Sequence, residues 1–271
     1  MKLNNSKDIP SLGFGTFRIS DLDVEDAVEY ALDVGYRHID TAAIYDNESG
    51  VGRGIKKSRI SREDIFLTTK LWLEVQKYND VIKAFEQSCQ KLNTDYIDLY
   101  LIHWPTENFL EQWNAMEELY SQGRIKSIGV SNFHQHHLLK LMENSSIIPS
   151  VNQIELHPFL SQEELVEFNK NHGIQTESWS PIMKGKVTEV DIIVELAKKY
   201  KKSPAQLTLR WHLQRNLVII PKSANKSRIS ENLDIFDFII EDEDMSLING
   251  LNKNQRIGSH PDILAKEKFG L

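Results

Sequence analysis

The 271-residue chain contains very little cysteine and has no excess of basic charge. Cys89 is its single cysteine, which excludes an intramolecular disulfide framework and favours a reducing compartment. Lysine and arginine number 32 against 39 acidic residues, which gives a net charge of -7. Because nucleic acid and anionic membranes attract basic proteins, we expect neither as a partner.

Long hydrophobic runs are absent as well. Nowhere do 18 apolar residues stand together, and residues 1–8 (MKLNNSKD) have no apolar stretch of the signal-peptide type. We therefore expect a soluble cytoplasmic protein. The hydrophobic content of 40% and the charged content of 26% are typical of globular proteins and exclude a disordered or low-complexity chain.

The length is compatible with one large domain or two small ones. No linker rich in proline, glycine or serine divides the chain, so we expect a single domain over residues 1–271. Chains of this size bury roughly 70 to 75% of their unfolded surface, and their core needs no disulfide or metal.

Short apolar runs alternate with segments of helical period, which is the pattern of βα units and a parallel sheet. The expected strands are residues 36–40, 65–70, 97–103, 125–130, 151–155, 174–178, 217–221 and 233–238. Eight strands with intervening helices and no linker favour a closed (β/α)8 TIM barrel over an open doubly wound sheet. Residues 9–17 (IPSLGFGTF) predict a small N-terminal β-hairpin that covers one barrel end.

The helical segments show buried stripes and end signals. Apolar positions recur at helical spacing in residues 24–32 and 81–92, and Cys89 lies in the second stripe, where we expect it to pack rather than react. Asp21 or Asp23 is the expected N-cap of the first helix, and Ser203 precedes a later helix that begins with proline. The expected C-terminal stops are Gly35, Gly123 and Gly173.

Three polar residues stand at the carboxyl ends of expected strands: Asp40, Lys70 and His103. In a barrel these ends form one rim, where polar residues indicate catalysis. Tyr45 follows Asp40 by five residues, on the loop above the same rim. A nearby ammonium lowers the pKa of a phenol. We therefore expect Lys70, held by Asp40, to lower the pKa of Tyr45. His103 is then expected to orient a carbonyl oxygen or to share in the proton relay.

Each of these residues also has a purely structural interpretation. Asp40 and Lys70 form a buried ion pair in that case, Tyr45 is a loop aromatic, and His103 is a hydrogen-bonded core histidine. This structural interpretation has to explain why polar residues stand at the ends of three strands at once.

Three long motifs follow one another along the chain. The first is residues 35–42 (GYRHIDTA), followed by Tyr45, residues 47–48 (NE) and residues 50–52 (GVG). The second is residues 126–133 (KSIGVSNF), and the third is residues 220–223 (IPKS), followed by Arg228 and residues 231–232 (EN). In these motifs and their order the chain resembles the aldo-keto reductases, in particular their compact prokaryotic-type members, and the resemblance covers nearly all of it.

The resemblance implies a role for each matching residue. The catalytic tetrad is Asp40, Lys70, His103 within residues 101–105 (LIHWP), and Tyr45 as the proton donor. The residues implied to bind the cofactor are Ser131, Asn132, Gln153, Trp179, Ser180, Lys222, Ser223, Arg228, Glu231 and Asn232. The residues implied to wall the substrate pocket are Trp72 and Trp104, for which rim packing is the alternative.

Within the cofactor set, Ser131, Asn132 and Gln153 are implied to hold the nicotinamide carboxamide. Trp179 stands where many relatives stack a tyrosine on the ring, and either aromatic face can stack. Lys222, Ser223 and Arg228 are implied to clamp the 2'-phosphate. Glu231 and Asn232 are implied to lie against adenine. The alternative for residues 222–228 is a solvated basic loop.

Two other sequence patterns are expected to have a structural role and no catalytic or binding role. Residues 50–54 (GVGRG) lack the spacing and the preceding strand of a dinucleotide fingerprint, so their glycines are expected to allow close helix packing. His134, His136 and His137 are too closely spaced for a zinc ligand set, and we expect a solvated helix start and no metal site.

The sequence as a whole predicts a monomeric, NADPH-dependent oxidoreductase that reduces aldehydes or ketones. A rival interpretation is a cofactor-binding sensor or structural protein without turnover. A doubly wound dehydrogenase is set aside, because the first strand is followed by Thr41 and Ala42 rather than by a glycine-rich turn. The stretch after His103 and the tail after Arg256 are short, which predicts an open pocket for small aldehydes, dicarbonyls or sugar-derived carbonyls.

Overall fold

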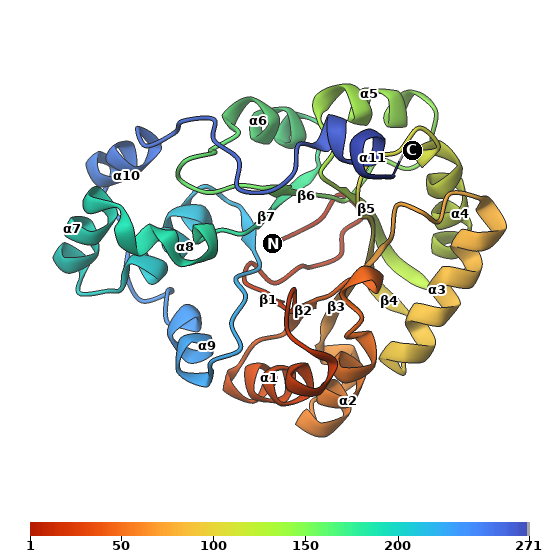
Figure 1. Cartoon of the computed structure of the whole chain (residues 1–271), viewed down its shortest axis with the longest axis horizontal. Helices are drawn as coiled ribbons and strands as arrows, with labels where there is room; N and C mark the ends of the chain where they lie inside the picture. Colours follow the sequence, from red (N-terminus) through yellow and green to blue (C-terminus); the bar gives the residue numbers. More distant parts are fainter. Residues whose placement is uncertain (270–271) are drawn as a thin grey trace.

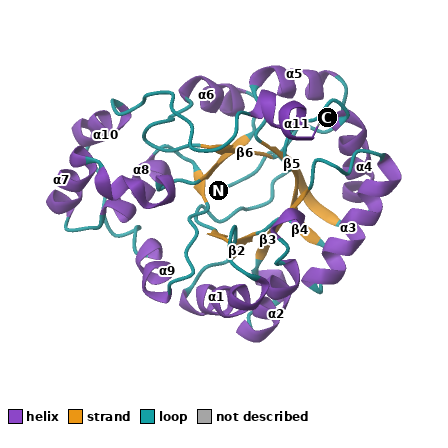
Figure 2. Cartoon of the chain, in the orientation of Figure 1, coloured by secondary structure: helices purple, strands orange, loops and turns teal. Residues whose placement is uncertain are grey.

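The computed structural model describes residues 1–269, and at its centre lies one eight-stranded parallel sheet. Strands that are neighbours in the chain are neighbours in the sheet. Figure 2 shows the strands around a central space, with helices outside them. The strands are β1 (Phe14–Gly15), β2 (His38–Asp40), β3 (Phe66–Leu71), β4 (Ile97–Ile102), β5 (Ile125–Ser131), β6 (Val151–Glu155), β7 (Gln175–Trp179) and β8 (Val218–Ile219). The predicted (β/α)8 barrel is confirmed.

Backbone contacts between the two ends of the sheet close the barrel. The amide of Gly13 donates to the carbonyl of Ile219 at 2.8 Å, and the amide of Gly15 donates to the carbonyl of Pro221 at 3.1 Å. A Cβ atom on Gly15 would lie 2.9 Å from the carbonyl oxygen of Ile220. Glycine is therefore needed where the two segments approach each other.

Two strand predictions fail at this closure. Residues 9–17 are not a hairpin, because Phe14 and Gly15 pair in parallel with β2 and form the first barrel strand. Residues 233–238 are not the eighth strand, because α9 (Lys226–Leu233) ends at their first residue. Ile235 is buried and Phe238 packs against Tyr200 of the helical layer. The two-residue strand β1 is too short to show the alternation of apolar and polar residues that is typical of a strand. The apolar residues after α9 have the pattern of a strand without forming one.

An N-terminal antiparallel turn does exist, but it precedes the expected segment. Lys2 and Asp8 pair in an antiparallel bridge. Leu3 and Ile9 on either side of this turn pack against Phe66, Leu99 and other residues inside the barrel. In Figure 1 the N-terminus lies over the middle of the barrel. Because Phe66 begins β3, the turn covers the amino end and leaves the carboxyl end of the strands open.

The helices form the outer layer of the barrel (Figure 1). They are α1 (Asp21–Val34), α2 (Glu48–Ser58), α3 (Tyr78–Leu92), α4 (Phe109–Ser121), α5 (Gln135–Glu143), α6 (Glu163–Asn171), α7 (Asp191–Tyr200), α8 (Pro204–Gln214), α9, α10 (Asp242–Asn249) and α11 (Pro261–Phe269). Among residues 1–269, no helix has both the length and the apolar character needed to cross a membrane.

The helix ends follow the sequence signals with one correction. Ser20, and neither Asp21 nor Asp23, is the N-cap of α1, because its side chain accepts a hydrogen bond from the amide of Asp23. Ser203 caps α8 in a reciprocal capping box with Gln206. The expected stops Gly35, Gly123 and Gly173 all have positive φ angles, of 120°, 74° and 69°.

The glycines of residues 50–54 allow α1 and α2 to pack closely, as predicted. A Cβ atom on Gly50 would lie 2.1 Å from the carbonyl oxygen of Asp21, and one on Gly54 would lie 2.6 Å from that of Glu25. Cys89 is buried on α3. Burial raises the pKa of its thiol to about 11, which agrees with a packing role.

Candidate active site

Four polar residues meet at the carboxyl edge of the barrel. Asp40 ends β2, Lys70 lies one residue before the end of β3, and His103 directly follows β4. The 3-10 helix η1 (Ala43–Tyr45) brings Tyr45 back over this edge. The ring centroids of Tyr45 and His103 are 5.8 Å apart, and Lys70 Nζ lies 5.2 Å from the Tyr45 centroid. Parallel strands that end at the same edge thus unite residues from four separate segments.

Asp40 and Lys70 form a buried ion pair. Lys70 Nζ donates to Asp40 Oδ1 at 2.7 Å, to Asp40 Oδ2 at 2.8 Å and to the carbonyl oxygen of Thr41 at 2.8 Å. The side chain of Lys70 is fully buried. Burial alone lowers the pKa of an amine, but here Asp40 and Tyr45 outweigh it and raise the pKa of Lys70. Lys70 therefore places a fixed positive charge under the tyrosine.

The pKa of Tyr45 differs from the expected direction. Burial raises the pKa of its hydroxyl above the ordinary value, and the nearby ammonium of Lys70 opposes this effect without cancelling it. The expected lowering by Lys70 acts, but desolvation of the phenolate is stronger in the folded protein. Tyr45 accordingly keeps its proton at neutral pH, as a proton donor must.

His103 is a neutral imidazole. Burial and the charge of Lys70 lower its pKa well below the usual value of 6.5. Its ring packs edge-on against Tyr45 and against Trp72, with the latter centroid at 5.3 Å. A neutral imidazole offers one donor and one acceptor nitrogen, so it suits the recognition of a carbonyl oxygen without adding a second charge.

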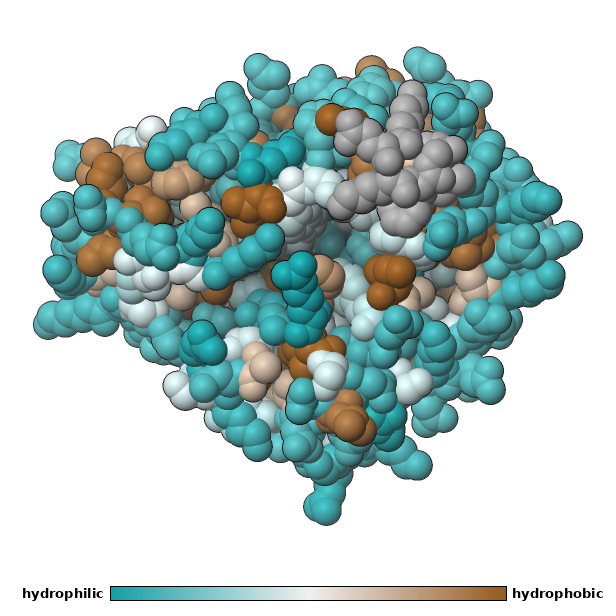
Figure 3. All heavy atoms as spheres, viewed as in Figure 1, coloured by the Kyte–Doolittle hydropathy of each residue, from teal (hydrophilic) through white to brown (hydrophobic). Residues whose placement is uncertain are grey.

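A cavity of about 1200 Å³ extends from this edge toward β8. Figure 3 shows a hollow near the centre of this face, with hydrophobic side chains at its border. Except for Lys70, which lies beneath Asp40, every site residue predicted from the sequence lines it. The structure therefore brings the predicted set together, while the role of each residue stays a prediction.

The residues implied to hold the nicotinamide are linked to one another. Asn132 donates from Nδ2 to the carbonyl oxygen of His103 at 3.0 Å and to Ser131 Oγ at 3.1 Å, and it adopts a positive φ of 63°. Trp179 Nε1 donates to Asn132 Oδ1 at 2.9 Å. Ser180 follows Trp179, also with a positive φ, of 52°. The indole that replaces the usual tyrosine is thus fixed in orientation.

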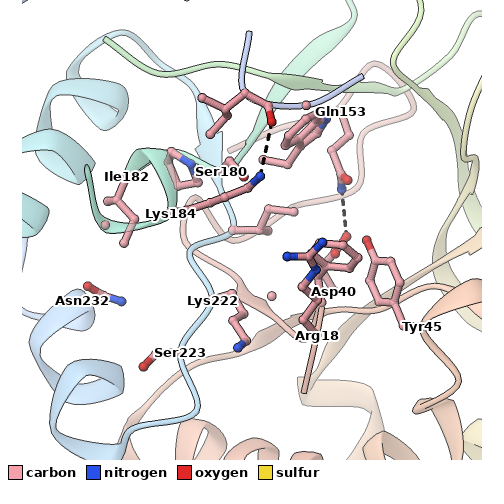
Figure 4. A pocket seen from close by; sticks show the side chains of 18 of the residues that line it. Arg18, Asp40, Tyr45, Gln153, Ser180, Ile182, Lys184, Lys222, Ser223 and Asn232 are labelled. Atoms are coloured by element: carbon pink, nitrogen blue, oxygen red, sulfur yellow. Dashed lines mark hydrogen bonds between the residues drawn. The ribbon is translucent and has the colours of Figure 1, made fainter. Parts of the chain in front are cut away.

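Gln153 has a second connection that the sequence did not suggest. Its Nε2 donates to Asp40 Oδ2 at 2.8 Å, as the dashed line in Figure 4 shows. Its backbone carbonyl accepts from Ser131 Oγ at 2.9 Å. One glutamine therefore joins the implied nicotinamide site to the ion pair of the tetrad.

The far end of the cavity is positively charged. Lys222 and Ser223 lie on the segment after β8, on the other side of Figure 4 from Tyr45. Arg228 and Arg18 also line the cavity. Burial, followed by the charges of Arg228 and Arg18, lowers the pKa of Lys222. Such a cluster suits an anion with several charges, for example a phosphate.

The aromatic end of the cavity lies near His103. Trp104, Leu73 and Leu264 form one apolar cluster, against which Trp72 and Trp179 pack. Leu264 belongs to α11, so the C-terminal helix contributes to the wall of the pocket. The tail is short, yet Ile257, Gly258, Ser259 and Leu264 line the cavity and form part of its wall.

Sequence analysis missed Arg18 and Lys184. Arg18 follows β1, and the mistaken hairpin concealed that this position lies beside the rim. Lys184, on the loop after β7, donates from Nζ to the carbonyl oxygen of Ile257 at 3.3 Å. Figure 4 shows this bond between two segments that both line the cavity. A search of every strand-following loop for basic residues would have found both.

Comparison with known proteins identifies the family. The family model described as "Aldo/keto reductase family" matches residues 11–253. Glyoxal reductase of Bacillus subtilis is 48% identical over 266 residues, covering 97% of this chain and 96% of its own. The crystal structure of MGS-M4, an aldo-keto reductase enzyme from a Medee basin deep-sea metagenome library, is 46% identical and has a TM-score of 0.95, covering 97% of this chain and 98% of its own.

A further solved structure is a complex with NADP. The aldo-keto reductase of Bombyx mori in complex with NADP is 38% identical, has a TM-score of 0.93, and covers 99% of this chain and 96% of its own. Sequence and fold agree with these relatives over nearly the whole chain. This protein is therefore an oxidoreductase that belongs to the aldo/keto reductase family.

Proposed function

We propose that this protein is an NADPH-dependent reductase that converts small aldehydes or ketones into alcohols. One observation carries the proposal: a tyrosine, a buried ion pair and a neutral histidine lie at one end of a single cavity, and Lys222 and Arg228 line the part of it that follows β8. The first end suits proton transfer to a carbonyl oxygen, and the second suits a phosphorylated cofactor.

The residues present fit NADPH. Arg18, Lys222 and Arg228 would hold its phosphates, with Ser223, Glu231 and Asn232 nearby. Ser131, Asn132 and Gln153 would hold the carboxamide, and Trp179, beside Ser180, would offer an aromatic face to the nicotinamide. When bound, NADPH supplies the hydride that reduces the carbonyl carbon. The chain supplies position, charge and a proton.

The tetrad performs the proton chemistry in this proposal. Tyr45 donates its hydroxyl proton to the carbonyl oxygen, because burial keeps that proton in place until an acceptor arrives. Lys70, fixed by Asp40, stabilises the phenolate that remains. His103 donates a hydrogen bond to the same oxygen and orients the carbonyl above Tyr45.

The walls of the pocket favour a small substrate. Trp72, Trp104 and Leu264 surround the space beside His103 with apolar surface. The Bacillus subtilis relative is a glyoxal reductase, which supports small dicarbonyls as the substrate class. Sugar-derived carbonyls are the next class to test.

The remaining expectations belong to the same proposal. We propose that residues 1–271 act as one domain and that the protein is a monomer. The single, buried thiol supports a reducing, cytoplasmic location. Size-exclusion chromatography with light scattering tests the monomer directly.

Tyr45→Phe tests the function. Turnover of NADPH with glyoxal, methylglyoxal and small sugar aldehydes is expected in the unchanged protein and is lost in the variant, because only the proton donor is missing. Cofactor fluorescence should show that NADPH still binds the variant. Tyr96→Phe, far from the rim, is the matched control. A protein that binds NADPH but reduces no carbonyl in the panel is instead a cofactor-binding sensor.

A further inference from the structure

Three histidines and one aspartate meet outside the catalytic tetrad. His134 is the N-cap of α5, and His136 and His137 lie in the first turn of this helix. Asp262 belongs to the first turn of α11, far away in the chain. Figure 1 shows α5 and α11 side by side. The expected solvated helix start agrees with the exposed His136, but His134 and His137 are largely covered, because the C-terminal helix packs against them and supplies a carboxylate.

The three imidazoles converge on one oxygen. Asp262 Oδ1 lies 2.9 Å from His134 Nδ1, 3.5 Å from His136 Nε2 and 3.7 Å from His137 Nε2. One such atom from each of the four residues lies within 4.8 Å of all the others. Ligand atoms of a tetrahedral zinc ion, at about 2.0 to 2.1 Å from the metal, are about 3.3 Å apart. Around a metal ion the pair at 2.9 Å would therefore widen slightly, and the widest pairs, at up to 4.8 Å, would close by about 1.5 Å.

Two of the histidines are largely buried, and the third is open to solvent. The exposed fractions are 20% for the side chain of His134 and 15% for that of His137, so both rings are held by packing. The side chain of His136 is 63% exposed and leaves a path for an ion from solvent. Nitrogen and oxygen donors of this kind select zinc and related transition metals over magnesium and calcium.

We propose that His134, His136, His137 and Asp262 form a binding site for one divalent transition-metal ion of the zinc class. The site clasps α11 to the N-terminus of α5. It lies apart from the carbonyl chemistry described above and does not depend on it.

Metal binding exchanges existing hydrogen bonds for coordination. His134 Nε2 lies 3.1 Å from an Arg256 nitrogen, and coordination through Nδ1 moves the ring proton to Nε2. Arg256 then has an alternative partner in Glu155, whose Oε2 lies 3.7 Å from its Nη1. His137 Nδ1 accepts from the amide of His134 at 3.1 Å and gives up this contact when Nε2 binds the metal. The clasp is therefore reversible rather than a permanent structural zinc site.

The clasp acts on the wall of the pocket. Leu264 lies two residues after Asp262 and packs with Trp104 and Leu73 beside the tetrad. Fixing the start of α11 fixes this wall as well. The metal is thus expected to tighten the C-terminal helix without touching the reacting atoms.

Calorimetric titration of the chelator-treated, full-length protein with zinc tests the site. One ion is expected to bind per chain, and calcium and magnesium are not. His136→Ala, at the most exposed ligand, and Asp262→Asn should each weaken zinc at least tenfold. His172→Ala removes a histidine outside the cluster and should leave the affinity unchanged. Circular dichroism and NADPH binding confirm that each variant is folded.

Hydrogen exchange provides the second measurement. Zinc should slow exchange at the amides of α11 in the unchanged protein and in His172→Ala, but not in Asp262→Asn. Equal zinc affinity in the unchanged protein and in His136→Ala overturns the site. Loss of affinity in His172→Ala to the same extent also overturns it, since binding then belongs to scattered surface histidines.

Discussion

Gln153 donates a hydrogen bond from Nε2 to Asp40 Oδ2 at 2.8 Å, next to the bond that Lys70 donates to the same oxygen. The carboxylate of Asp40 thus connects β6 with β2 and β3. Gln153, which is implied to hold the cofactor, thus also stabilises the carboxylate of Asp40, and this carboxylate binds Lys70. If Gln153 holds the cofactor as proposed, this single side chain couples cofactor binding to the tetrad.

Gln153→Met removes this coupling while it keeps the length of the side chain. We expect NADPH to bind about tenfold more weakly and turnover to fall as well, because a hydrogen bond to a charged group contributes about 1.5 to 3 kcal/mol. Fluorescence titration and initial rates measure the two effects. Gln175→Met, at the start of β7, is the control. Unchanged binding and turnover in Gln153→Met would show that the contact has no functional role.

Lys70→Met removes the buried ammonium beneath Tyr45. Turnover should fall by a factor of about 10² or more, since the phenolate left after proton transfer loses its counter-charge. Lys57→Met, which disrupts an exposed ion pair with Asp26, is the control and should keep full turnover. Stopped-flow rates and thermal unfolding are measured on both variants. If Lys70→Met loses stability alone and keeps its turnover per folded molecule, the pair is purely structural.

Arg228→Ala tests the phosphate clamp against the solvated-loop alternative. Unchanged protein should bind NADPH at least tenfold tighter than NADH, and the variant should lose most of this preference, because NADH has no 2'-phosphate. Some loss for NADH is acceptable where the guanidinium stacks on adenine. Lys226→Ala, in the same basic segment, does not line the cavity and is the control. Equal losses for both cofactors would refute the clamp.

Glu177 on β7 makes the stability of the fold depend on pH. Burial, followed by the charge of Asp40, raises the pKa of this carboxyl from 4.5 to about 8. Between these values the unfolded chain releases the proton while the folded chain keeps it, so the free energy of unfolding decreases as the pH rises. Below pH 4.5 both states are protonated and the effect vanishes.

Glu177→Gln should remove this dependence. Urea unfolding at pH 5, 6.5 and 8 is expected to show a growing advantage of the variant over the unchanged protein, because the amide never ionises. Glu195→Gln, at an exposed position of α7, is the control and should follow the unchanged protein. A constant difference between pH 5 and 8 would mean that Glu177 is already ionised in the folded state.

The barrel and its rim could be predicted because their signals are local. Apolar runs such as residues 97–102 identify buried parallel strands, and Asp40, Lys70 and His103 stand where such strands end. The closure was missed because β1 has two residues and its pairing depends on the close approach of Gly15 to the last strand. That approach is a property of two distant segments and leaves no periodic pattern in either.

The sequence by itself determined the barrel and the family, since periodicity and motif order are written along the chain, and it predicted Asp40, Tyr45, Lys70 and His103 as the tetrad. Only the tertiary structure decided the direction of the Tyr45 pKa, because desolvation depends on what surrounds the phenol and outweighs the charge of Lys70. It also decided that Gln153 meets Asp40 and that Asp262 meets His134. These pairs are separated by more than a hundred residues, and only folding brings their polar atoms within hydrogen-bond distance.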